Sequence, residues 1–163
     1  MRNYLHITLT PLFLLAFIAT STMASAAPEL SISTLVEKDV QRVDENGQSR
    51  VERVEAADVA PGETLYFTLT YRNSGDTAAT NVKLDNPVSG DTVYVPGSAW
   101  GEGSEILFSI DGGETYKKAA ALTYQVDSQT RTAEPEQYNA VRWIVGEIPA
   151  GEQGSVGFSA RVK

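Results

Sequence analysis

Residues 59–88, VAPGETLYFTLTYRNSGDTAATNVKLDNPV, decide the fold class of this chain. After a Pro-Gly-Glu turn, apolar and polar residues alternate over 65–72, which places one apolar row on one face of a β-strand. The sequence Asn-Ser-Gly-Asp at 73–76 interrupts this strand, and alternation resumes over 82–87. The stretch therefore predicts a turn, a strand, a second turn and a second strand.

Short stretches with the same alternation recur along the chain, and turn-forming residues separate them. They fall at 29–37, 93–95, 105–110, 122–126, 141–145 and 156–162. We see no credible helix after residue 26. The pattern predicts an all-β protein, an antiparallel immunoglobulin-like β-sandwich made of one domain over 27–163, with a barrel as the structural alternative. The core is expected to contain Leu65, Phe67, Leu69, Tyr71, Val82, Leu84, Phe108, Val141, Trp143, Val145, Val156 and Phe158.

An N-terminal strand and a hairpin are expected over 29–56. Asn46-Gly47 is a strong signal for a tight hairpin turn, and valines and mixed charges flank it over 38–55. The valines recur three residues apart, so a helix is the alternative to a two-stranded ribbon. In contrast, the polar segment 127–137 contains a proline and predicts a long surface loop.

A secretory signal peptide is predicted over residues 1–26. Arg2 gives it a basic start, an apolar run follows at 12–19, and residues 24–26 read Ala-Ser-Ala, the form of a cleavage site. A membrane anchor would need about 20 apolar residues, so this run is too short. We therefore expect an exported protein, periplasmic or extracellular, with no membrane span after cleavage.

The composition excludes several chemistries. The chain has no Cys, and its single His, His6, lies inside the predicted signal peptide. The exported part therefore lacks the residues of Ser-His-Asp triads, thiol nucleophiles and common zinc sites. The net charge of −8 also makes nucleic acid and anionic lipid poor partners. We predict a protein that is not an enzyme and that has no catalytic, cofactor-binding or metal-binding residues.

Four motifs carry a resemblance to a known family. The turn at 61–63 precedes the Thr-rich strand, residues 73–82 follow it, Val-Pro-Gly-Ser occurs at 95–98, and Trp-Ile-Val-Gly-Glu-Ile-Pro-Ala-Gly-Glu ends at residue 152. In this order they resemble the bacterial conserved-repeat domain, the immunoglobulin-like "domain of unknown function eleven" family, over 59–162. The resemblance implies a surface or secreted module, here a single copy with a signal peptide. It implies no catalytic or ligand-binding residues.

Loops rich in carboxylates contain the other candidate sites. Residues 109–116, Ser-Ile-Asp-Gly-Gly-Glu-Thr-Tyr, are similar to an Asp box, but a hairpin turn in which Asp111 caps backbone amides explains the same residues. A Ca²⁺ site or a glycosidase-type carboxylate pair is a further alternative to a solvated acidic rim. The carboxylates in question are Asp85, Asp91, Glu102, Asp111 and Glu114.

Aromatic residues provide a last candidate, a platform on which a sugar could stack. Its possible members are Tyr66, Tyr94, Trp100, Tyr116, Tyr124 and Tyr138. Trp100 lies among glycines and is the best exposed candidate, although a packing role is the favoured interpretation for it. A carbohydrate- or calcium-binding module is therefore the alternative to our main expectation.

The main expectation is a non-enzymatic module with a structural or protein–protein interaction role at the bacterial cell envelope. The strand at 30–37 is rich in Ser and Thr, and it is the candidate sheet edge for an unknown protein partner or a second copy. The ribbon at 38–55 is the other candidate. Both edges could instead be merely protected by their charges.

Overall fold

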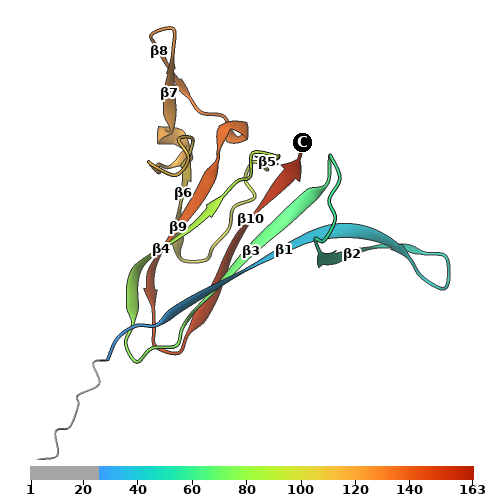
Figure 1. Cartoon of the computed structure of the whole chain (residues 1–163), viewed down its shortest axis with the longest axis horizontal. Coiled ribbons are helices and arrows are strands. Elements are labelled where there is room, and N and C mark those ends of the chain that lie inside the picture. Colours follow the sequence, from blue (N-terminus) through green and yellow to red (C-terminus); the bar gives the residue numbers. More distant parts are fainter. Residues whose placement is uncertain (1–25) are drawn as a thin grey trace, which may run out of the picture.

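A computed structural model describes residues 26–163 and shows two antiparallel β-sheets packed face to face (Figure 1). The predicted signal peptide lies outside the described residues, apart from Ala26. In the described part of the chain, no helix has the length and apolar character needed to cross a membrane. The prediction of an all-β antiparallel sandwich is confirmed.

The larger sheet has five strands in the order β2-β1-β3-β10-β5, the smaller has the order β4-β9-β6, and β7 pairs with β8. The strands are β1 (Leu30–Val43), β2 (Ser49–Glu55), β3 (Thr64–Asn73), β4 (Ala79–Pro87), β5 (Thr92–Tyr94), β6 (Ser104–Ser109), β7 (Thr123–Val126), β8 (Gln129–Thr132), β9 (Ala140–Ile148) and β10 (Gln153–Val162). Two 3₁₀ turns, η1 (Ala119–Ala121) and η2 (Pro135–Gln137), complete the elements of the described residues. In an immunoglobulin constant domain the final strand belongs to the smaller, three-stranded sheet. Here the final strand, β10, lies beside β3 in the larger sheet.

β1 is one continuous strand where the sequence suggested a strand followed by a hairpin. Its first part, Leu30 to Lys38, pairs with β3, and its last part, Glu37 to Val43, pairs with β2. Because β2 lies on the edge of β1 that faces away from β3, the β1–β2 ribbon reaches beyond the sandwich (Figure 1). The hairpin prediction is confirmed and the helical alternative is wrong.

The predicted core lies between the two sheets. Ten of its twelve residues are buried, and the other two, Phe67 and Val82, are half-buried and pack against the same cluster. Trp143 is fully buried, and its indole nitrogen donates a hydrogen bond to the backbone oxygen of Trp100 at 2.9 Å. The ring of Phe67 stacks on that of Phe158 with centroids 4.7 Å apart. The alternating pattern therefore identified the inner faces of β3, β4, β9 and β10.

The predicted surface loop at 127–137 is wrong in part. Residues 129–132 form β8, which pairs with β7 in a separate hairpin, and η2 follows. Asp127 and Ser128 turn this hairpin with positive φ angles of 48° and 63°. A two-residue turn usually takes glycine or asparagine at such positions, so this turn gave no sequence signal.

The Asn73 side chain links two turns and the segment before β1 at one end of the sandwich. Its side-chain amide is buried and donates to the backbone oxygens of Thr77 and Ile148 at 2.7 and 3.0 Å. Its side-chain oxygen accepts from the backbone N–H groups of Glu29 and Gly75. The segment that precedes β1 is therefore fixed to the β3–β4 and β9–β10 turns.

Candidate functional site

The first part of β1 has one unpaired edge. Leu30 to Lys38 pairs with β3 on one side, whereas β2 begins to pair only at Glu37 on the other side. Just before that point, the Val36 carbonyl accepts a hydrogen bond from Ala56 N–H at 2.9 Å. Within residues 26–163, no strand covers this edge from Leu30 to Leu35. The predicted candidate edge is thus an open edge in the structure.

The inner side of this edge is mostly apolar but exposed. The register places Leu30, Ile32, Thr34 and Val36 on the same face as the buried row of β3, and all of these except Thr34 are apolar. Nevertheless, Leu30 is 41% and Ile32 is 53% exposed. The reason is that the second sheet has three strands and ends at β4, so it leaves β1 uncovered. Residues 30–36, LSISTLV, also contain no ionisable side chain.

The ribbon beyond this edge carries charges that pair with one another. Arg53 donates to Asp39 through Nε at 2.9 Å, and its guanidinium lies 3.5 Å above the centre of the Tyr66 ring. Tyr66 also donates its hydroxyl to Asp39, at 2.9 Å. Hydrogen bonds from Arg53 and then Tyr66 lower the pKa of the Asp39 carboxyl. This network satisfies the charges at the base of the ribbon and fits a guarded edge.

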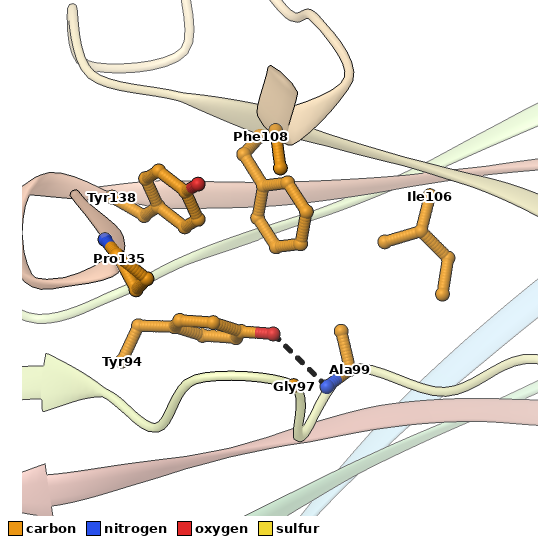
Figure 2. A pocket seen from close by; sticks show the side chains of 8 residues that line it. Tyr94, Gly97, Ala99, Ile106, Phe108, Pro135 and Tyr138 are labelled. Atoms are coloured by element: carbon orange, nitrogen blue, oxygen red, sulfur yellow. Dashed lines mark hydrogen bonds between the residues drawn. The ribbon is translucent and has the colours of Figure 1, made fainter. Parts of the chain in front are cut away.

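The opposite flank of the sandwich contains an apolar pocket of about 280 Å³ (Figure 2). It opens between the two sheets where β5, only three residues long, faces β6. The side chains that line it are contributed by β5, the β5–β6 connection, β6, η1 and η2: Tyr94, Gly97, Ala99, Ile106, Phe108, Ala119, Pro135 and Tyr138. Phe108 and Tyr138 stack with ring centroids 4.5 Å apart, and Tyr94 packs against both.

Little polar chemistry is available in this pocket. The hydroxyl of Tyr94 accepts a hydrogen bond from Ala99 N–H at 3.1 Å, the one bond drawn among the lining residues in Figure 2. The Tyr138 hydroxyl makes no bond to the others. Burial raises the pKa of Tyr138, so this phenol is neutral at physiological pH. Among residues 26–163, no ionisable group other than tyrosine lines the space.

The turn that resembles an Asp box is held by its own groups. Asp111 accepts hydrogen bonds from the Ser109 hydroxyl at 2.7 Å and from Thr115 N–H at 2.9 Å. These bonds, first that from Ser109, hold the pKa of Asp111 well below its ordinary value. Gly112 and Gly113 take positive φ angles of 78° and 90°. The capped hairpin turn is therefore the observed role of this motif.

The other candidate carboxylates do not converge. Asp85 forms a two-pronged ion pair with Arg142, with oxygen–nitrogen distances of 2.6 Å. The guanidinium of Arg142 also lies over the ring of Tyr116, 3.8 Å from its centre. Over residues 26–163, no three acidic or histidine side chains are grouped so that they could hold a metal ion.

The six aromatic residues considered for a sugar-stacking platform do not form one surface. Tyr94 and Tyr138 are buried in the core cluster, while arginines cover Tyr66 and Tyr116. Trp100 is separate from them and 45% exposed, and its ring rests against Gly157, whose backbone N–H and C=O both pair with Trp100. No sequence pattern indicated the pocket, because residues as distant as Tyr94 and Tyr138 meet only in the folded chain.

In comparisons with known proteins, no protein-family model, no curated protein and no solved structure matches the chain.

Proposed function

We propose that the chain is an exported, non-enzymatic immunoglobulin-like module that acts at the bacterial cell envelope by binding a partner protein. Its open β1 edge, Leu30 to Leu35, carries this proposal. Unpaired backbone groups of such an edge can hydrogen-bond an added strand, and this is a common mode of peptide recognition. The predicted signal peptide at 1–26 and the resemblance to the conserved-repeat family support export and the module class.

The chemistry of the edge defines the partner strand. Because residues 30–36 carry no charge, the partner strand is uncharged where it pairs. On its inner side it presents apolar residues, which would cover Leu30 and Ile32 and extend the core row. On the outer side, the side chains of the partner strand lie beside Ser31 and Ser33, where small polar residues fit.

A second copy of this chain fits the edge less well than a different protein. The antiparallel register that overlaps the whole segment 30–36 with its copy would place Glu29 opposite Glu37. Like charges directly opposite each other destabilise a strand pair. The net charge of −8 on each copy adds to this repulsion.

Site-specific photocrosslinking in intact cells tests the proposal. A photoreactive residue at Ser33 samples the open edge, one at Val51 samples the ribbon, and one at Val59 is the control on an exposed loop. We expect one defined product from position 33, and peptide sequencing of that product should reveal an uncharged extended segment of another protein. Crosslinking at position 51 alone would assign docking to the ribbon and contradict the proposal.

A second candidate function, carbohydrate binding, has one observation in its favour. Trp100 exposes an aromatic ring on the outer face of the larger sheet, in the same cross-strand row as Gly157, Thr68 and Leu35. This row and the row of Ser33, Thr70 and Ser155 contain no charged residue, which would suit a neutral sugar, whereas the row on the other side contains Glu37. A glycan array with the wild type and Trp100→Ala tests it: binding that Trp100→Ala abolishes supports this function, and an array without signal rejects it.

A further inference from the structure

We propose that the pocket between β5 and β6 binds a small, uncharged aromatic molecule of one or two rings. The pocket lies on the flank opposite the β1 edge, so this inference is independent of the proposed partner docking. Its shape, its lining and its few polar groups each restrict the ligand.

The volume sets the size of the ligand. An engineered apolar cavity of about 150 Å³ is sufficient for benzene. The pocket here has about 280 Å³, which accommodates two fused rings, and it is partly open to solvent. Small residues create the space, because Gly97, Ala99 and Ala119 line it where larger side chains would fill it.

The lining sets the chemistry of the ligand. The rings of Phe108, Tyr138 and Tyr94 pack against one another and form one aromatic wall, with Ile106 to one side (Figure 2). Aromatic rings prefer stacked or edge-on contacts with other rings, which adds about 0.5–1.5 kcal/mol per pair to the effect of burial. A charged group inside would lack a partner and lose its hydration. The Tyr138 hydroxyl can donate or accept one hydrogen bond with a polar atom on the ligand.

The backbone around the pocket argues against a peptide as the ligand. Phe108 exchanges both backbone hydrogen bonds with Lys117, at 2.8 and 3.0 Å. Ala99 N–H is bound to the Tyr94 hydroxyl, and Tyr138 N–H is bound to the Pro135 oxygen. These groups cannot also fix the main chain of a peptide. The pocket therefore suits a free molecule better than a side chain of a bound polypeptide.

Indole is a suitable probe, because it is neutral, has two fused rings and carries one polar N–H. We expect saturable chemical-shift changes at the rings of Tyr94, Phe108 and Tyr138 in the full exported chain, with no changes from glucose. N-acetyl-tryptophanamide, the same ring in a peptide setting, should bind at least tenfold more weakly. Tyr138→Phe should weaken indole binding about fivefold, the effect of one neutral hydrogen bond.

Filling the pocket provides the matched test. Ala99→Phe places a ring inside and Ala119→Trp covers the mouth from an exposed position, so the second variant remains informative if the first fails to fold. Both should abolish indole binding, whereas Ala78→Trp in the β3–β4 turn and Ile32→Lys on the β1 edge should leave it unchanged. The proposal is overturned if indole does not perturb the pocket rings of the folded wild type, if binding survives in the filled variants, or if the amide binds as tightly as indole. None of these results would affect the partner-docking proposal.

Discussion

Ile32 and Tyr71 are directly opposite each other in the β1–β3 ladder, yet Tyr71 is 9% exposed and Ile32 is 53% exposed. The two side chains share one face of the larger sheet. The smaller sheet covers that face over β3 but stops before β1. The contrast shows where the sandwich ends and where an apolar row remains uncovered.

This contrast predicts different costs for two substitutions. Ile32→Lys should change the free energy of unfolding by less than about 0.5 kcal/mol, as is usual for surface positions. Leu69→Ala, in the buried row of β3, should cost about 2–5 kcal/mol. Urea unfolding of both variants measures the difference. A loss of several kcal/mol in Ile32→Lys would mean that the side chain is covered in solution.

Trp143 should be the most sensitive core position. It is fully buried, it contacts the Phe158 ring, and its indole N–H is bonded to the Trp100 oxygen. Trp143→Ala should cost about 3–5 kcal/mol, a large share of the stability of an ordinary domain. Trp100→Ala is the matched control, because it removes an exposed indole while the acceptor oxygen stays. Equal losses in the two variants, measured by urea unfolding, would refute the core assignment.

Asn73→Ala should destabilise the end of the sandwich where the β3–β4 turn, the β9–β10 turn and the segment before β1 meet. It would remove the donors to the Thr77 and Ile148 oxygens, and each buried polar group left unpaired costs about 1–3 kcal/mol. Amide exchange should also increase around Glu29, which loses its acceptor. Asn86→Ala, which removes one hydrogen bond near the surface, is the control. Equal melting temperatures for the two variants would contradict this role.

Asp111 should remain ionised at unusually low pH. Its folded pKa is depressed, first by the Ser109 hydroxyl and then by Thr115. The stabilisation that follows is fully present above the ordinary aspartate pKa of about 4 and is lost only as the pH falls through the lower folded value. Carbon-detected NMR titration of the side-chain carboxyl measures this, with Ser109→Ala as the variant that raises the pKa. An ordinary titration midpoint in the wild type would show that the turn is open.

The sequence predicted those parts of the fold that depend on local periodicity. The alternation in β3, β4, β9 and β10 identified their inner faces, because each strand has one buried row. The β7–β8 hairpin was missed because Asp127 and Ser128 adopt left-handed conformations without glycine. The open edge was expected near Leu30, but the exposure of Ile32 depends on how far the other sheet extends. Sequence alone does not give that extent. The pocket was missed because Tyr94 and Tyr138 are distant in the sequence and come together only in the folded chain.

Amide hydrogen exchange on the complex with the crosslinked partner tests the central claim most directly. In the free protein, every second amide over 30–35 points to the open edge and should exchange quickly, because neighbouring residues of an antiparallel strand point to opposite edges. Partner binding should protect these alternate amides and leave those of β2 at Ser49–Glu55 unchanged. Protection confined to β2, or no new protection in β1, would contradict strand addition at this edge.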